Sequence, residues 1–237
     1  MEIFLSLVIP FFNEENRLRQ SLPQILTFIH QQSFRTELIL SNDGSTDQSL
    51  KVAAEILKDQ PHLILSEPAN QGKGTAVRRG MLAAQGKYIL FSDADLSTPL
   101  SEILRFFPYF DQGFDIVIGS RALDRSKIEI RQAPLREGMG RIFNTIAQFL
   151  TFQGIQDSQC GFKCFTREAA QVLFALQKIP GFAFDAEILY LAQKKGYRIK
   201  EESVIWRNEP QSRVKLLSDP IKMFCDLVKI RLIHQKD

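Results

Sequence analysis

The chain alternates short, largely apolar runs with segments of helical periodicity, and this alternation constrains its fold more than any other feature of its 237 residues. The short runs predict strands at residues 4–9, 37–40, 62–65, 88–91 and 115–118. Strands that alternate with helices at this spacing form βαβ units. The sequence therefore predicts an α/β fold with a doubly wound, mostly parallel sheet and helices on both faces.

Apolar residues at helical spacing fill the intervals, at 14–31, 45–58, 75–84 and 101–110. Ser45 or Thr46 is the expected cap of the second of these helices. Beyond residue 120 the pattern is less regular but predicts further helices at 141–152, 183–195 and 220–234, and strands at 161–165 and 198–206. No internal repeat or low-complexity linker separates these segments, so we expect one compact unit.

Polar clusters follow several predicted strands directly. In doubly wound sheets, ligands bind at the carboxyl ends of the strands. We therefore expect the functional site at this edge of the sheet. The clusters are Asn13-Glu14, Asn42-Asp43, Asp93 with Asp95, and Arg121.

The strongest cluster is Asp93-Ala94-Asp95, which comes directly after a buried strand. Two carboxylates two positions apart on a turn can face the same ligand. Mg²⁺ or Mn²⁺ typically binds through one or two carboxylates together with a substrate diphosphate. The alternative is structural, because Asp residues also cap helices and occupy solvated turns.

Residues 42–47 (Asn-Asp-Gly-Ser-Thr-Asp) follow another predicted strand. An acidic side chain there can accept a hydrogen bond from a base or a ribose hydroxyl, but a strand–turn–helix cap explains the same residues equally well. No G-x-G-x-x-G sequence follows a strand, which argues against a nicotinamide-dependent dehydrogenase. Residues 72–75 (Gly-Lys-Gly-Thr) lack the earlier glycine of a P-loop, which argues against that class of ATPase.

A set of basic residues is the third candidate for ligand binding. Arginine suits bidentate binding of phosphate, although most arginines are solvated surface residues. Arg121 is the best placed, because it lies at the carboxyl end of a predicted strand. The set consists of Lys73, Arg78, Arg79, Arg121, Arg131, Arg136, Arg141, Arg207, Arg213 and Lys215.

Charge and cysteine content exclude several classes of protein. The formal net charge of +3 is too small to imply a nucleic-acid partner, and the positive excess lies after Trp206. The 3 cysteines argue against a secreted disulfide framework, and the scattered histidines argue against a zinc site. No apolar run approaches the roughly 18 residues that span a bilayer, and residues 1–4 lack the cationic start of a signal peptide. We expect a cytoplasmic chain.

Several motifs occur in an order typical of one family. They stand at 8–14 (VIPFFNE), 42–47 (NDGSTD), 70–74 (NQGKG), 93–95 (DAD) and 119–121 (GSR), and are continued at 157–163 (DSQCGFK) and 184–187 (FDAE). Over residues 3–215 the chain resembles the family 2 inverting glycosyltransferases, which have the GT-A fold. Within that family it is similar to the transferases that place a sugar on a polyprenyl phosphate, namely the dolichyl-phosphate mannose synthases and β-glucosyltransferases.

The resemblance implies a nucleotide diphosphate sugar as donor and a polyprenyl phosphate as acceptor. Asp95 is expected to be catalytic by holding the metal, Mg²⁺ or Mn²⁺, on the diphosphate, with Asp93 and Ser97 as further metal ligands. Other residues are implied to line the base and ribose pocket or to close over the nucleotide. These nucleotide-binding residues are Pro10, Phe12, Glu14, Asp43, Lys73, Asp93 and Ala94.

On the acceptor side, the resemblance implies that Arg121, Arg136 and Arg213 bind the acceptor phosphate and are the other catalytic residues. Asp157 and Glu187 are implied to shape the sugar and acceptor side. A phosphate is largely ionised at neutral pH, with a second pKa near ~6, so no strong general base is required. The arginines then orient one anion against another, and attack opposite the leaving diphosphate inverts the anomeric carbon.

Two departures from the family pattern bear on the donor. Asn42 replaces the first Asp of the usual Asp-Asp-Gly-Ser, which alters the expected base contact. Ser97 stands where mannosyl-type members often have a Gln metal ligand, and residues 95–99 (DLSTP) are closer to the glucosyl type. The favoured donor is therefore UDP-glucose, with GDP-mannose as the alternative.

A polyprenyl acceptor lies in a membrane, and two apolar segments are candidates for reaching it. Residues 142–152 and 220–234 are rich in large apolar side chains, and the second also carries Lys222, Lys229 and Arg231. A basic amphipathic helix can lie in the interface of an anionic bilayer. The alternatives are packing on the sheet and, for the second segment, dimerisation. We expect peripheral attachment to the cytoplasmic membrane face through the second segment.

The expected organisation is a catalytic domain at 1–215, with a nucleotide-binding half (1–121) and an acceptor-side half (122–215), followed by a basic helix at 216–237. Three other functions compete with polyprenyl transfer. A transferase with a glycan or diacylglycerol acceptor needs a base rather than three cations. A nucleotidylyltransferase normally has a glycine-rich loop after the first strand, where residues 10–14 contain no glycine. A non-catalytic sugar-nucleotide-binding protein would tolerate loss of Asp95.

Overall fold

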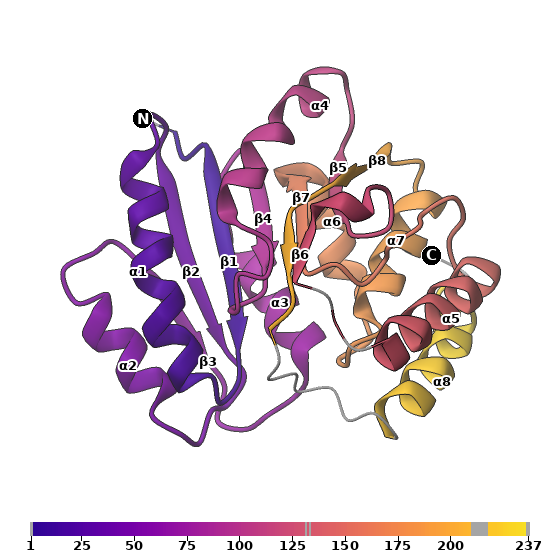
Figure 1. Cartoon of the computed structure of the whole chain (residues 1–237), viewed down its shortest axis with the longest axis horizontal. Coiled ribbons are helices and arrows are strands. Elements are labelled where there is room, and N and C mark those ends of the chain that lie inside the picture. Colours follow the sequence, from indigo (N-terminus) through magenta and orange to yellow (C-terminus); the bar gives the residue numbers. More distant parts are fainter. Residues whose placement is uncertain (1, 131, 133, 210–217, 236–237) are drawn as a thin grey trace.

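A seven-stranded sheet forms the centre of the computed structural model, which describes residues 2–130, 132, 134–209 and 218–235 (Figure 1). Most neighbouring strands are parallel, but β7 is antiparallel to both of its neighbours. The predicted doubly wound, mostly parallel sheet is confirmed. In spatial order the strands are β3 (Leu63–Ser66), β2 (Thr36–Asn42), β1 (Leu5–Phe11), β4 (Tyr88–Ser92), β7 (Phe162–Thr166), β5 (Ile116–Ser120) and β8 (Ile199–Ser203).

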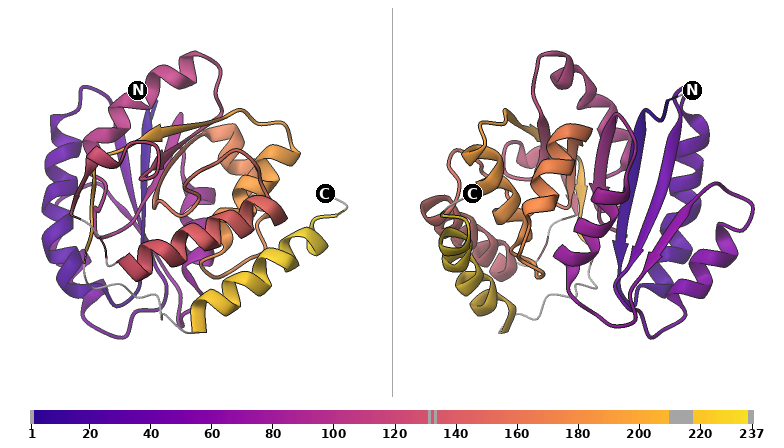
Figure 2. Two further views of the ribbon diagram at one scale, coloured as in Figure 1. Left: turned by 45° about the vertical axis from the view of Figure 1, so that its right-hand side comes forward. Right: turned by 180° about the vertical axis from the view of Figure 1, so that it is seen from behind.

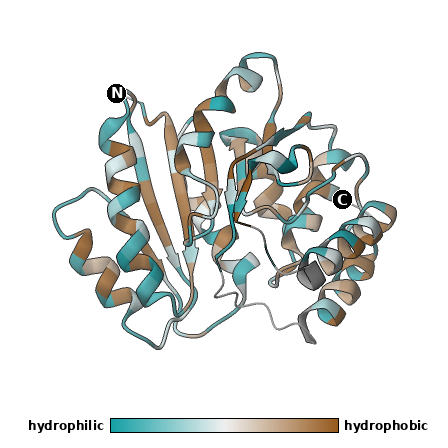
Figure 3. Ribbon diagram, viewed as in Figure 1, coloured by the Kyte–Doolittle hydropathy of each residue, from teal (hydrophilic) through white to brown (hydrophobic). Residues whose placement is uncertain are grey.

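Helices cover both faces of the sheet, and strands β1, β4 and β5 are buried along their whole length for that reason. Along β1, Leu5, Leu7 and Ile9 pack under one helical layer, whereas Val8 packs under the other. All of β1 is consequently buried, which explains its continuous apolar sequence. In Figure 3, β1 and β2 are mostly hydrophobic, whereas the outer helix α1 mixes both colours, as expected of a helix with one buried face.

One helical layer consists of α1 (Glu15–Gln31), α2 (Ser49–Ile56), the short helix η1 (Leu100–Arg105) and α4 (Phe107–Asp111). The other contains α3 (Lys73–Ala83), α6 (Arg167–Leu176) and α7 (Phe184–Lys194). Outside this second layer, α5 (Pro134–Leu150) and α8 (Ser218–Ile233) lie side by side (Figure 2). Within the described residues, no helix combines the length and apolarity needed to cross a membrane.

A small two-stranded sheet joins distant parts of the chain beside the main one. It pairs β6 (Ile128–Ile130), which follows the short helix η2 (Arg125–Lys127), with β9 (Trp206–Arg207). The backbone N–H of Arg207 also donates to the carbonyl of Ser97, at 2.8 Å. This bond ties the second half of the chain to the loop after β4.

Several local predictions were wrong for identifiable reasons. The second helix begins at Ser49, and Ser45 does not cap it because its hydroxyl accepts from the backbone N–H of Asn13, at 2.9 Å. The helix predicted at 101–110 is divided into η1 and α4, with a proline in the first turn of α4. Helix α6 (Arg167–Leu176), which begins directly after β7 with Thr166 as its cap, was not predicted from the sequence.

The cysteines provide a test of this packing. Cys160 and Cys164 are buried and Cys225 is exposed, and all three are free thiols. Burial raises the pKa of the Cys160 thiol to about 12 and also raises that of Cys164, so neither forms the reactive thiolate at neutral pH. We expect a thiol reagent to label Cys225 rapidly and the other two only after unfolding, as read by peptide mass spectrometry. Rapid labelling of Cys164 in the native protein would contradict this core.

Candidate active site

The carboxyl ends of the central strands bring the polar clusters to one edge of the sheet. Strand β1 is parallel to β2 and β4, with Phe11 opposite Asn42 and Val8 opposite Phe91. The residues that follow these strands therefore lie near one another, toward the lower edge in Figure 1. This is where the sequence predicted the site, as expected for a doubly wound sheet.

Asp93 is held between a cation and a glycine. The Nζ atom of Lys73, at the start of α3, lies 2.6 Å from Oδ1 of Asp93. The backbone N–H of Asp93 donates to the carbonyl of Gly161, at 3.0 Å. A Cβ atom on Gly161 would lie 2.0 Å from Oδ2 of Asp93, so a side chain at this position would displace the Asp93 carboxylate. The Asp93 side chain remains 34% exposed, which leaves it accessible to a ligand.

Lys73 stays cationic although it is partly enclosed. Burial acts to lower the pKa of Lys73, but the carboxylates of Asp93 and Asp185 outweigh it and raise that pKa above its ordinary value. Behind Lys73, the fully buried Lys163 contacts Oδ1 of Asp185 and the carbonyl of Cys160, each at 2.6 Å. Burial raises the pKa of Asp185, while the Lys163 charge opposes the rise. Positive and negative side chains therefore alternate from the buried Lys163–Asp185 pair to Lys73 and Asp93.

Asp95 lies in a tight loop whose backbone is strained. Leu96 has a φ of 49°, an uncommon value for a residue with a branched side chain. The backbone N–H of Ser97 donates to Oδ1 of Asp95, at 3.0 Å. Burial, and then the negative charge of Asp93, raise the pKa of Asp95 above its ordinary value. A bound cation would relieve this repulsion.

The donor set suits a divalent ion that shares its coordination with a ligand. Within the described residues, no group of three or more His, Cys, Asp or Glu side chains could hold a metal alone. Mg²⁺ is usually held by one or two carboxylates plus substrate phosphates. Asp93 and Asp95 supply such carboxylates. Ser97 contacts Asp95 through its backbone N–H, and its role as a metal ligand stays a prediction.

Asp43 fixes the loop that precedes α3. Its carboxylate accepts from the Asn70 side chain (2.8 Å) and from the backbone N–H groups of Gln71 (3.0 Å) and Gly72 (2.9 Å). Asp43 is only 2% exposed, so its oxygens face this loop more than solvent. The predicted contact of Asp43 with a base or ribose is untested, whereas its part in placing Lys73 is visible.

The other predicted nucleotide-side residues lie around the end of β1 and the loop after β4. Pro10 is buried within β1, Phe12 follows β1, and Ala94 is buried between the two Asp residues. The Glu14 carboxylate pairs with Arg17, at 2.8 Å. They lie at the expected edge, and their contacts with a nucleotide stay a prediction.

Arg121 and Asp157 form a bidentate ion pair on the other side of the site. The Nε and Nη2 atoms of Arg121 lie 2.6 and 2.7 Å from the two oxygens of Asp157, and the backbone N–H of Arg121 also donates to it. The guanidinium lies 5.3 Å from the centre of the Trp206 ring. Burial opposes ionisation, but Arg121 holds the pKa of Asp157 below its usual range. The Arg121 side chain remains 25% exposed.

Of the three other predicted acceptor-side residues, the structure describes the side chain of Glu187 alone. Glu187 is fully buried, and its carboxylate accepts from backbone N–H groups and contacts His234, so its position is structural. Arg136 lies in the first part of α5, and its side chain is outside the described residues, as is all of Arg213.

Several residues that shape the site were not assigned a role from the sequence. Gly161 and Lys163 belong to the motif at 157–163, but only the fold brings them against Asp93 and Asp185. Trp206, predicted only as a strand residue, supports the Arg121 guanidinium. The sequence signal that could have indicated a role for Gly161 was its place within the motif at 157–163.

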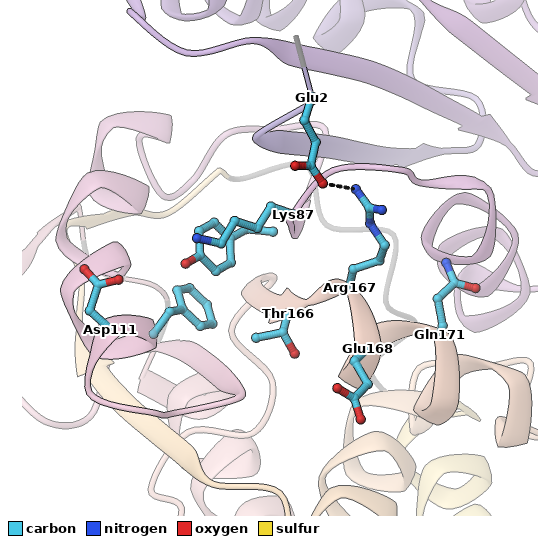
Figure 4. A pocket seen from close by; sticks show the side chains of 9 residues that line it. Glu2, Lys87, Asp111, Thr166, Arg167, Glu168 and Gln171 are labelled. Atoms are coloured by element: carbon cyan, nitrogen blue, oxygen red, sulfur yellow. Dashed lines mark hydrogen bonds and ion pairs between the residues drawn. The ribbon is translucent and has the colours of Figure 1, made fainter.

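A pocket of about 640 Å³ lies at the opposite edge of the sheet (Figure 4). Its residues include Tyr88 at the start of β4 and Thr166 at the end of the antiparallel β7. Arg167 spans it to reach Glu2, at 3.4 Å. None of the predicted site residues lines it, so the carboxyl edge remains the candidate active site.

Comparison with known proteins shows the family of the chain. The model of the family described as glycosyl transferase family 2 matches residues 6–174. A dolichyl-phosphate beta-glucosyltransferase of Dictyostelium discoideum is 37% identical, over 97% of this chain and 74% of its own length. The relative of the same description in Trichomonas vaginalis, ALG5A, is 35% identical, over 98% and 74%.

A solved structure has the same fold. Glucosyl-3-phosphoglycerate synthase from Mycobacterium tuberculosis, in complex with Mn²⁺, UDP and phosphoglyceric acid, gives a TM-score of 0.69 at 20% identity. The match covers 97% of this chain and 78% of that one. The GT-A fold predicted from the sequence motifs is confirmed.

The contact between Gly161 and Asp93 is testable by substitution. Gly161→Ala forces a methyl group against the Asp93 carboxylate and should destabilise the protein by about 1–3 kcal/mol. Gly140→Ala is the matched control, because nothing lies within 4 Å of its Cβ position in the exposed part of α5. That change should stabilise by about 0.5–1 kcal/mol. Urea unfolding measures both, and equal effects would contradict the proposed close contact.

The pair between Arg121 and Asp157 predicts a pH-dependent stability. The pKa of Asp157 is lower in the folded protein than the ordinary Asp value, so the pair stabilises the protein at any pH above that ordinary value. This stabilisation is lost as the pH falls through the folded-state pKa. Asp157→Asn should cost about 2–3 kcal/mol at neutral pH, since Arg121 loses its partner. The difference from wild type should shrink in acid. A difference that is constant with pH would exclude the charge pair as its cause.

Proposed function

The chain belongs to glycosyl transferase family 2, and from that premise we propose that it transfers glucose from UDP-glucose to a polyprenyl phosphate of the dolichyl type. The observation that carries the proposal is the group formed by Lys73, Asp93 and Asp95 at the carboxyl end of β4. Two close carboxylates and a lysine suit a metal-bound diphosphate. The choice of glucose and dolichyl phosphate rests on the relatives, whose descriptions name both.

On the donor side, this chain's residues bind and orient the diphosphate. Asp93 and Asp95 would hold Mg²⁺ or Mn²⁺, which would act as a Lewis acid and neutralise charge on the leaving diphosphate. Lys73 lies 2.6 Å from Asp93 and carries a fixed positive charge, which places it to contact a phosphate oxygen. That the protein of related fold was solved with Mn²⁺ and UDP supports a divalent metal and a uridine nucleotide as ligands.

On the acceptor side, Arg121 is placed to orient the attacking phosphate. Its planar guanidinium is fixed by Asp157 and Trp206, so little ordering is needed when an anion binds. The acceptor phosphate is already ionised near neutral pH and needs no strong base. Attack from the face opposite the diphosphate inverts the anomeric carbon. Arg136 and Arg213 remain proposed partners in this step.

We propose different roles for successive parts of the chain. We keep residues 1–121 as the nucleotide-binding half, 122–215 as the acceptor-side half and 216–237 as a C-terminal helical addition. The first half supplies Lys73, Asp93 and Asp95. The second supplies Asp157, and its strand β8 pairs with β5, which ends beside Arg121.

The outer surfaces of α5 and α8 are proposed to contact the membrane that contains the acceptor. Each helix has a side packed on the protein, where Ala147, Leu227 and Ile230 are fully buried. Each also exposes large apolar side chains, so the two alternatives, packing and membrane contact, apply to different sides of the same helix. The exposed residues are Ile142, Phe149, Ile221, Phe224, Val228 and Leu232.

Charge supports an anionic lipid surface as the partner of these helices. Lys222, Lys229 and Arg231 lie on α8 among the exposed apolar residues. Basic side chains beside exposed apolar ones are the composition of an interfacial helix. We propose peripheral attachment, and the free thiols fit the reducing cytoplasmic side.

A transfer assay tests the reaction. Incubation with Mg²⁺ or Mn²⁺, a polyprenyl phosphate and labelled UDP-glucose should move label into the lipid phase, whereas GDP-mannose should not. Asp95→Asn should reduce the rate by about 100-fold or more, because it removes a metal ligand. Asp111→Asn, at the opposite edge of the sheet, is the control and should leave the rate unchanged. Transfer from GDP-mannose and not from UDP-glucose would mean that GDP-mannose is the donor. Nucleotide binding without transfer of any sugar would favour a non-catalytic binding protein.

Vesicle sedimentation tests the membrane surface. Phe149 is 84% exposed, and its replacement in Phe149→Ser should weaken binding to anionic vesicles by about tenfold, since burying a Phe is worth about 1.5–3 kcal/mol. Leu104→Ser is the control, because Leu104 is exposed on the opposite helical layer. Equal binding of the Phe149→Ser and Leu104→Ser variants to the vesicles would contradict membrane contact. Dimerisation that depends on Phe149 would also contradict it.

A further inference from the structure

The loop that carries Lys73 is held from two sides. Asp43 holds residues 70–72 on one side, as described above. On the other side lies the segment 177–181, which connects α6 to α7. The Gln177 side chain donates to the carbonyl of Gly74 (2.9 Å), and the backbone N–H of Thr75 lies 3.3 Å from the carbonyl of Pro180. Along the chain, Lys73 lies between residues 70–72, which Asp43 holds, and residues 74–75, which contact segment 177–181.

The contact between the two segments leaves no room for adjustment. A Cβ atom at Gly72 would lie 2.4 Å from the carbonyl oxygen of Pro180, and one at Gly74 would lie 2.6 Å from that of Ile179. Two backbones are therefore in van der Waals contact. A shift of segment 177–181 must displace the start of α3, and Lys73 with it.

Glu187 determines where segment 177–181 lies. From the first turn of α7, its two carboxylate oxygens accept from the backbone N–H groups of Lys178 and Ile179, each at 2.8 Å. The Nε2 atom of His234 lies 2.6 Å from Oε1 of Glu187. The His234 tautomer that carries its hydrogen on Nε2 donates to this carboxylate. Both side chains are 0% exposed.

His234 comes from the end of α8, which the rest of the protein holds in place. Leu227 and Ile230 of α8 are fully buried. The Nζ atom of Lys178 lies 3.2 Å from the carbonyl of Ile233, and the Lys194 side chain donates to the carbonyl of His234. The helix end is therefore fixed where its histidine meets Glu187.

We propose that Glu187 and His234 are positioning residues for the donor nucleotide, acting through segment 177–181 on Lys73. The bond from His234 aligns the Glu187 carboxylate, which in turn sets the backbone on which Gly72 and Gly74 rest. This gives Glu187 a role on the donor side rather than the sugar and acceptor side. The inference rests on the proposed function only in taking Lys73 to contact the donor diphosphate.

Calorimetric titration with UDP in the presence of Mn²⁺ tests the proposal on the full chain. His234→Ala should weaken UDP binding by about threefold to tenfold. His234→Gln, whose amide can still donate to Glu187, should bind UDP nearly as wild type does. Cys225→Ala changes an exposed residue of α8 that is not among the proposed membrane-contact residues, and it is the matched control.

Hydrogen exchange provides a readout that needs no nucleotide. In His234→Ala, the amides of residues 72–75 and 178–179 should exchange faster, while those of α1 stay unchanged. Folding of each variant is confirmed first by its thermal transition. Wild-type UDP affinity and unchanged exchange at 72–75 in a folded His234→Ala would overturn the inference. Absence of UDP binding by the wild type would instead overturn the proposed function.

Discussion

The ion pair between Lys73 and Asp93 is the interaction on which the rest of the site depends. It joins the start of α3 to the end of β4, and every neighbouring feature serves to place one of its partners. Gly161 provides the space for the Asp93 carboxylate, and Asp43 fixes the loop before Lys73. A diphosphate bound with a metal ion would meet a cation and two carboxylates that the fold already holds together at the end of β4. Such preorganisation is what lowers the cost of binding a charged ligand.

The site concentrates charge that the fold must support. Asp95 is partly desolvated beside Asp93, and this raises its pKa, which is unfavourable for the unliganded protein. Hydrogen bonding from Ser97 and the positive charge of Arg17 offset part of this rise. The contrast with the relaxed, apolar interior of the sheet marks this edge as functional.

The sequence was sufficient for the strands of the main sheet, most helices and the edge that carries the site, because apolar periodicity and the polar residues after several strands are local signals. It did not predict β6, and it joined β8 and β9 into one strand. It was insufficient where a long-range contact decides the outcome. The direction of β7 depends on its neighbours, and the need for Gly161 depends on the approach of Asp93. Glu187 was assigned to the acceptor side from its motif, whereas the fold pairs it with His234, 47 positions away.

The central claim is that the carboxyl end of β4 binds the metal and the donor diphosphate. A crystal structure of the chain grown with UDP and Mn²⁺ tests it most directly, because the anomalous signal of manganese locates the ion without assumptions. The account predicts the manganese peak beside Asp95 and Asp93, with Lys73 contacting the diphosphate. Manganese and UDP bound elsewhere, such as in the pocket lined by Tyr88 and Arg167, would contradict it.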